Sequence, residues 1–192
     1  MLTYLLMKKY RNMLYASTLN PSLQHIMTVR RDFMRNLKCN LAMASIMGGN
    51  LYPNIHGTVY FEEVTGGTEV TAKIWGLPLY RPATPSSQPI GPFGFHIHQF
   101  GRCEITDPND PFASAGEHYN PTNQPHGNHV GDFPVLFSND GYAMMKFFTN
   151  KFIPRYVIGR SVMIHENPDD YRTQPSGNSG KRIACGVICS VE

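Results

Sequence analysis

Two histidines one residue apart form the stretch of this sequence that is best suited to chemistry. The segment "GFHIHQFGRC" holds His96 and His98, and Cys103 follows five residues later. On an extended strand, side chains two positions apart point to the same face. Paired imidazoles on a rigid strand suit a first-row transition metal ion. The spacing therefore predicts part of a metal site, although a strand can also carry two histidines by chance.

A second group of potential ligands lies further along the chain. The segment "HGNHVGD" offers His126, His129 and Asp132 at steps of three. A tight loop with this spacing can close three ligands around one ion, and a His/His/Asp set suits zinc. His25 and His56 stand outside both groups, and we expect them to be ordinary surface or packed residues.

The elements that must position these ligands have the pattern of an all-β protein. Strand patterns occur at 42–47, 55–64, 69–77, 93–100, 142–149, 161–166 and 183–191. Strands at this spacing, with turns between them, predict a sandwich or a barrel. We expect no helix of useful length after residue 40.

Three stretches between the strands predict loops. Residues 80–92 contain four prolines, and residues 101–132 are rich in Gly, Pro, Asn and Asp. Residues 167–182 form a third irregular stretch. Long loops without regular structure are uncommon and are usually functional. We therefore expect the second and third stretches to be the two functional loops of the domain.

The charge distribution divides the chain into two parts. Residues 1–39 carry seven Lys or Arg and one Asp, whereas residues 40–192 have a net charge of −3. We expect residues 1–39 to be a basic extension, either targeting or disordered, and residues 40–192 to be the β domain. An arm that binds nucleic acid or a membrane surface stays open as an alternative. A secretory signal fits poorly, because the Lys pair follows the short apolar stretch instead of preceding it.

Five segments resemble one known family. In order, "GFHIHQFG", "SAGEHYNP", "HGNHVGD", "IHENPDD" and "GNSGKRIACGVI" are similar to the motifs of the copper/zinc superoxide dismutases. The resemblance covers about residues 40–192 and is nearest to the shorter-looped type. It implies a Greek-key β-barrel, related in architecture to immunoglobulin-type sandwiches. It also implies an oxidoreductase with copper and zinc cofactors, which converts superoxide to dioxygen and hydrogen peroxide in antioxidant defence.

The resemblance also implies a role for each motif residue. Asp169 would orient one histidine on the copper side and one on the zinc side. Cys103 and Cys185 would form a disulfide, which would close a long loop. Arg182 would attract the anionic substrate and act in catalysis together with His118, the imidazole that bridges the two metals. The implied copper ligands are His96, His98, His118 and His165, and the implied zinc ligands are His118, His126, His129 and Asp132.

Some features depart from the family pattern and leave alternatives open. Phe93 stands where the family often has a histidine, and Cys189 is an additional cysteine that we expect to be a buried thiol. A relative that binds metal without catalysis is a second hypothesis, although it would be expected to lose copper ligands or Arg182. A nucleic-acid-binding module is a third, and it rests only on the basic arm.

The resemblance implies partners and bears on location. The expected partners are the superoxide anion, a second copy in a homodimer and a copper chaperone, with no nucleic acid. No apolar stretch approaches the roughly 18 residues needed to span a membrane, so we expect no membrane span. The expected location is the cytoplasm. Mitochondrial or other organelle targeting and packaging in a virus particle stay open, and the disulfide does not imply secretion because intracellular family members keep theirs.

Overall fold

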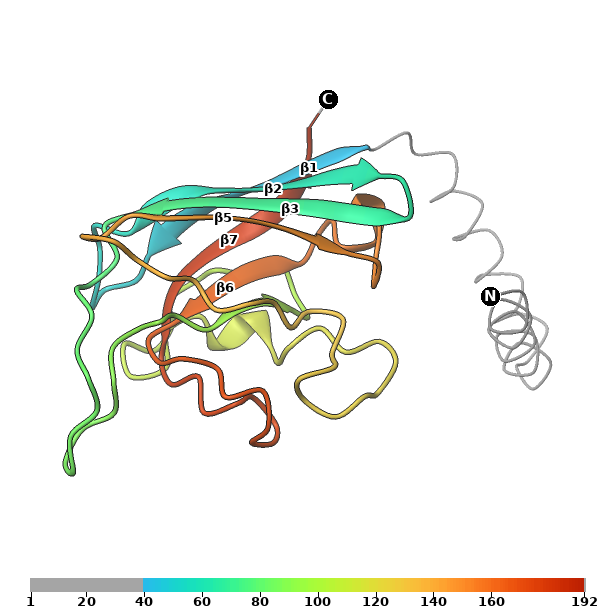
Figure 1. Cartoon of the computed structure of the whole chain (residues 1–192). Helices are drawn as coiled ribbons and strands as arrows, with labels where there is room; N and C mark the ends of the chain where they lie inside the picture. The colour runs from blue at the N-terminus through green and yellow to red at the C-terminus, as the bar shows by residue number, and fades with distance from the viewer. Residues whose placement is uncertain (1–39, 192) are drawn as a thin grey trace. The chain divides into compact units, whose positions relative to one another are not determined.

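The computed structural model describes residues 40–191, which form seven strands and two short 3₁₀ helices (Figure 1). The predicted basic extension, residues 1–39, lies outside the described residues, so its role stays a prediction. The elements are β1 (Leu41–Gly48), β2 (His56–Val64), β3 (Gly67–Trp75), β4 (Phe95–His98), η1 (Ala113–Ala115), β5 (Ala143–Thr149), η2 (Pro154–Tyr156), β6 (Ser161–His165) and β7 (Arg182–Ser190).

The seven strands form one antiparallel sheet in the order β4-β6-β7-β1-β2-β3-β5. The chain passes from β3 to β4 at the opposite edge, returns to β5 beside β3, and crosses again to β6. These long crossings between antiparallel strands are Greek-key connections. Figure 1 shows the sheet curling, so that β6 and β7 lie beneath β2, β3 and β5. The all-β Greek-key prediction is confirmed.

The core lies inside the curl of the sheet. Strand alternation turns every second side chain of β2 and β3 inward, and Phe61 pairs with Val70 on the buried face. Phe133, from the loop after β4, is buried in this core. Its ring centroid lies 6.5 Å from that of Phe61 and 5.2 Å from that of Phe95. The functional loop is therefore anchored in the core by its own aromatic side chain.

The edge strand β4 is covered by the loop that follows it. The Ile97 N–H donates to the Gly131 carbonyl, Gly131 donates to Tyr119, and Tyr119 donates back to Ile97, at 2.9, 2.9 and 2.7 Å. A β-carbon at Gly131 would collide with the Ile97 carbonyl, so only glycine allows this close approach. The same contacts bring His118 and Asp132 beside β4, where each forms an isolated bridge with it.

One expectation from the sequence is confirmed with added detail, and another is wrong. Residues 80–92 contain no strand or helix, as predicted, but two isolated antiparallel bridges join Arg81 to Ile90 and Thr84 to Ser87. The prolines of this segment fall between the positions that donate these hydrogen bonds, so the bridges tolerate them. Cys189 is exposed and not buried.

The described residues also bear on two other expectations. Phe93 is buried in the main core, and its backbone exchanges two hydrogen bonds with Leu136, so the histidine expected there is replaced by a packed ring. Within residues 40–191, no helix is long and apolar enough to cross a membrane.

Candidate metal centre

Strands β4 and β6 bring three histidines together. His96 and His98 lie on β4 and are almost completely buried. β4 pairs with β6, which ends at His165, and an irregularity in the pairing between Ile164 and His165 marks this end. The Nε2 atoms of His98 and His165 lie 3.2 Å apart. Two imidazoles of different strands therefore direct the same ring atom to one point.

His118 reaches the same point from the long loop after β4. Its ring stacks on that of His96, with 3.8 Å between the centroids. One ligand atom from each of these residues lies within 4.8 Å of the others. We call this set the four-histidine cluster, and its members are His96, His98, His118 and His165.

The second set, here called the mixed cluster, consists of His118, His126, His129 and Asp132. Asp132 Oδ1 lies 3.0 Å from His118 Nδ1 and 3.2 Å from His129 Nδ1, and Asp132 Oδ2 lies 3.4 Å from His126 Nδ1. Tetrahedral zinc with bonds of about 2.0–2.1 Å sets its ligand atoms about 3.3 Å apart. The spacing of the mixed cluster therefore matches a zinc site.

Asp169 joins the two clusters. Its Oδ2 accepts a hydrogen bond from His96 Nε2 at 2.7 Å, and its Oδ1 accepts one from His126 Nε2 at 2.8 Å. All three side chains are fully buried. A β-carbon at Gly177 would collide with the Asp169 carboxylate. The carboxylate therefore fixes which nitrogen of each ring faces its cluster, as such partners do for metal-bound histidines.

Four of the ring nitrogens that face the clusters have no hydrogen-bond partner in the protein. His98 Nδ1 and His165 Nδ1 donate to the Gly116 and Gly180 carbonyls, which leaves each Nε2 to its cluster. Buried polar atoms without a partner are rare in proteins, and each requires an explanation. Ligation of metal explains these. Among the described residues, the histidine atoms buried without a hydrogen bond are His96 Nδ1, His118 Nε2, His126 Nδ1 and His129 Nδ1.

The donor chemistry of each cluster favours a particular ion. Four imidazoles suit copper, which soft and borderline nitrogen ligands bind well. Three imidazoles and a carboxylate suit zinc. The Nδ1 atoms of His126 and His129 lie close to the Asp132 carboxylate but form no hydrogen bond with it. Ligand atoms of a single ion have this kind of close, unbonded arrangement. The residues present therefore fit a copper ion and a zinc ion that share His118.

Burial favours the neutral form, which is the form that binds metal, at His96, His98 and His165. It lowers the pKa of His96 and of His98 well below the usual value, and the neighbouring histidines lower both further. Burial and the electrostatic interaction with neighbouring His118 lower the pKa of His165 to about 3. For Asp132, burial acts to raise the pKa, but the hydrogen bond from His118 and the nearby histidines hold it well below the usual range.

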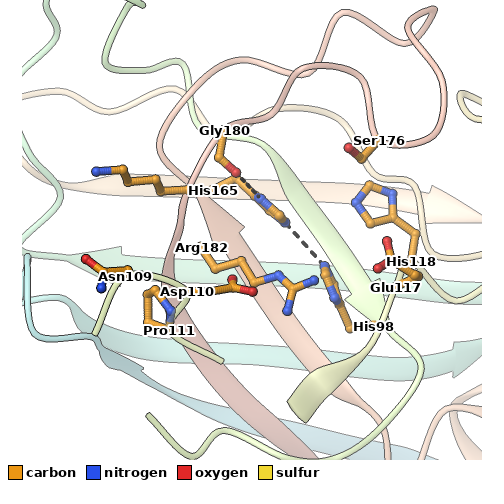
Figure 2. A pocket seen from close by; sticks show the side chains of 11 residues that line it. His98, Asn109, Asp110, Pro111, Glu117, His118, His165, Ser176, Gly180 and Arg182 are labelled. Carbon is orange, nitrogen blue, oxygen red and sulfur yellow. Dashed lines mark hydrogen bonds between the residues drawn. The ribbon is translucent and has the colours of Figure 1, made fainter. Parts of the chain in front are cut away.

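A pocket of about 230 Å³ opens onto the four-histidine cluster (Figure 2). His98, His118, His165 and Arg182 all line it. Arg182 Nη1 donates to the Phe112 carbonyl and Nη2 to the Gly116 carbonyl, each at 2.9 Å. Figure 2 shows the guanidinium between the segment of Asp110 and the histidines. A small anion entering this pocket would therefore meet a fixed positive charge beside the cluster.

The pocket wall also carries negative charges. Asp110 and Glu117 line it together with Lys181 and Arg182. Neither carboxylate forms an ion pair or accepts a side-chain hydrogen bond within residues 40–191. Both acids lie in a loop, and loop residues show no periodicity in the sequence that would place them at a pocket. They weaken the positive potential that Arg182 and Lys181 provide.

Sequence reasoning also missed Lys151. Its Nζ donates to the His129 carbonyl at 2.8 Å, which holds the backbone of the mixed cluster from outside. Lys151 lies after β5, and no local pattern links it to the ligands. The predicted Cys103–Cys185 disulfide is present, and His56 is exposed and apart from both clusters. His25 lies outside the described residues.

Comparison with known proteins agrees with this geometry. The sequence model of the copper/zinc superoxide dismutases matches residues 55–188. The chain is 34% identical over 154 residues to a Cu-Zn superoxide dismutase of Deinococcus radiodurans, which covers 71% of this chain and 79% of that one. It is 35% identical over 165 residues to Cu-Zn superoxide dismutase 3 of Arabidopsis thaliana. That match covers 77% of this chain and 88% of the relative.

A solved structure is similar as well. The Cu/Zn superoxide dismutase of Brucella abortus aligns with a TM-score of 0.62 and 28% sequence identity. The alignment covers 77% of this chain and 98% of that one.

Replacing Asp169 by Asn tests the link between the clusters. The amide would present an N–H to one of the two Nε2–H groups, so that histidine must move its proton to the ligating nitrogen. We expect metal affinity to fall about 10–100-fold at the affected cluster. Competition of a chelator for bound Zn²⁺ and Cu²⁺ measures the affinities. Asp170→Asn, an exposed neighbouring change, is the control, and equal affinities in both variants would contradict the role of Asp169.

The buried histidines predict how the metal-free protein responds to pH. Because folding lowers the pKa of His96, His98 and His165, the unfolded chain binds more protons below about pH 6.5. The full stability is present above that pH and falls as the pH drops towards 3. For each histidine that stays neutral in the folded protein, the free energy of unfolding falls by about 1.4 kcal/mol per unit decrease in pH below about 6.5. Urea unfolding of the metal-free protein at pH 7.5, 6 and 5 measures this, and an unchanged midpoint would refute it.

Proposed function

Because the chain belongs to the copper/zinc superoxide dismutase family, we propose that it disproportionates superoxide at a copper ion bridged to zinc by His118. Two superoxide anions and two protons give one dioxygen and one hydrogen peroxide. The four-histidine cluster would hold copper and the mixed cluster would hold zinc. The enzyme is thus an oxidoreductase of antioxidant defence that depends on both metals.

The observation that carries the proposal is that His118 belongs to both clusters. Its Nδ1 lies 3.0 Å from Asp132 Oδ1, and its Nε2 is buried without a partner. A single imidazole can bind one metal through each nitrogen when both protons are absent. One ring nitrogen beside Asp132 and the other without a protein partner support the role of His118 as the shared ligand.

Copper, when bound, supplies the one-electron couple, whereas zinc has no redox chemistry and can only organise the site. The part of His118 is to handle a proton. Its Nε2 takes up a proton in the first half-reaction, when one superoxide leaves as dioxygen. In the second half-reaction it gives that proton to the reduced substrate, and solvent gives the other. Its Nδ1 stays directed to the mixed cluster, which returns the ring to its starting orientation.

Arg182 would bind and orient the substrate. Two of its nitrogens are tied to the Phe112 and Gly116 carbonyls, so the planar guanidinium keeps one orientation on the pocket wall. A fixed guanidinium can attract a small anion and donate hydrogen bonds to it. The pocket of about 230 Å³ beside the guanidinium has room for a small anion next to His98, His118 and His165.

Other expectations from the family stay proposals of the same kind. We include among them the homodimer, delivery of copper by a chaperone, and the cytoplasmic location. No contact within residues 40–191 bears on any of the three. The role of residues 1–39 likewise stays a prediction.

The proposed function is tested with full-length protein reconstituted with copper and zinc. We expect the rate constant for superoxide loss to approach the order of 10⁹ M⁻¹s⁻¹, measured by pulse radiolysis. His165→Ala removes one imidazole of the four-histidine cluster and should lower the rate at least 100-fold. His56→Ala, which changes an exposed histidine, should leave the rate unchanged. Absence of turnover in protein that holds one copper and one zinc per chain would indicate a metal-binding relative without this activity.

We predict that the negative charges of the acidic side chains in the pocket lower the rate constant for reaction with superoxide. Replacing Asp110 by Asn and Glu117 by Gln removes two negative charges from the path of an anion. We expect the rate constant to rise about two- to threefold at low ionic strength and the gain to shrink as salt is added. Asp140→Asn, a charge change outside the pocket, is the control. A gain of equal size in this control would show that only net charge matters.

A further inference from the structure

Phe112 has a backbone conformation that is unusual for its residue type. It precedes η1 with φ 65° and ψ 21°, in the left-handed region. Residues with a β-carbon rarely adopt this conformation, and for a bulky residue it is an outlier that the surroundings must hold in place. The side chain is nonetheless almost completely buried. Something in the fold therefore keeps Phe112 where its backbone is disfavoured.

The consequence of this conformation is the position of one carbonyl. The Phe112 carbonyl accepts hydrogen bonds from the Ala115 N–H at 3.0 Å and from Arg182 Nη1 at 2.9 Å. At the other end of η1, the Gly116 carbonyl accepts from Arg182 Nη2 at 2.9 Å and from His98 Nδ1 at 2.8 Å. The guanidinium thus donates hydrogen bonds to two carbonyls that flank a single helical turn. Rotation of the Phe112 peptide would break one of these two hydrogen bonds.

The ring of Phe112 is what holds that peptide. It packs in a small cluster with Ala115, Met163 and Cys185, separate from the main core. It also lies against Gly49, where an added β-carbon would be 3.1 Å from Phe112 Cε2 and 3.2 Å from Cζ. The Gly49 backbone is itself fixed by a hydrogen bond to the Ile183 carbonyl. The ring is therefore confined on several sides, and the peptide cannot turn unless the ring leaves its position.

We propose that Phe112 is a positioning residue for Arg182: its confined ring holds a left-handed backbone whose carbonyl orients the guanidinium towards the substrate. This inference rests on the proposed function only for its kinetic consequence, because the hydrogen bonds of Arg182 can be observed without catalysis. The Cys103–Cys185 disulfide contributes indirectly, since Cys185 packs in the same cluster as the Phe112 ring.

The kinetic test is a double-mutant cycle on the copper- and zinc-loaded enzyme. Phe112→Ala removes the ring and should lower the rate constant for superoxide about tenfold or more, because small misplacements of an orienting group have effects of this size. In an Arg182→Ala background, the same change should have less than a twofold effect, since nothing is left to orient. Phe112→Leu, which keeps an apolar side chain in the cluster, should restore most of the rate.

Two controls separate positioning from loss of packing. Ile105 packs against the same cluster but has no bond to Arg182, so Ile105→Ala should leave the rate unchanged. Gly49→Val crowds the ring from another element and should lower the rate as Phe112→Ala does. This second route also tests the inference if Phe112→Ala does not fold.

A direct readout uses the guanidinium itself. In the zinc-loaded, diamagnetic protein, the two hydrogen-bonded Nη groups of Arg182 should give separate N–H resonances in NMR spectra, assigned by their loss in Arg182→Lys. We expect these resonances to merge or broaden in Phe112→Ala and Gly49→Val but to persist in Ile105→Ala. This measurement stands even if the parent enzyme shows no turnover, a result that would refute only the proposed function.

The inference would be overturned by either of two results. One is Arg182 resonances in Phe112→Ala that match those of the parent. The other is an effect of Phe112→Ala on the rate that is equally large with and without Arg182, which would assign the ring a purely structural role.

Discussion

The buried carboxylate of Asp169 couples the two ligand clusters, and the geometry of both depends on it. Its two oxygens bind the Nε2 atoms of His96 and His126, so each ring must turn its Nδ1 to its own cluster. The Tyr171 N–H also donates to this carboxylate, and Gly177 leaves no space beside it. Since one anion holds a ring from each cluster in the low dielectric of the interior, neither cluster can be rearranged alone.

Strand pairing and loop hydrogen bonds hold this arrangement in place. The pairing of β4 with β6 sets the positions of the strand residues His96, His98 and His165. The loop residues His118 and Asp132 are brought to the same place by hydrogen bonds between their backbone neighbours and β4. Backbone contacts thus position the ligands, and such support is the condition for a precise metal site.

The four-histidine cluster and Arg182 are linked through one short turn. The Gly116 carbonyl accepts hydrogen bonds from both His98 Nδ1 and Arg182 Nη2, so a histidine of the cluster and the arginine proposed to bind substrate are held by the same carbonyl. The same turn carries the Phe112 carbonyl at its other end. Because Asp110 lies just before it and Glu117 just after it, this loop also sets the charge that an approaching anion meets.

The sequence by itself determined the ligand types, the strand pattern and the all-β fold, because these follow from local spacing: His96 and His98 share a face of one strand whatever surrounds them. The resemblance of its motifs to a known family added the disulfide and the role of Asp169. The tertiary structure alone decided the rest. Lys151 reaches the His129 carbonyl across 22 residues, and Cys189 is exposed at the end of β7 although its pattern suggested a buried thiol. Such contacts depend on which distant segments cover a surface, and short-range periodicity contains no information about that.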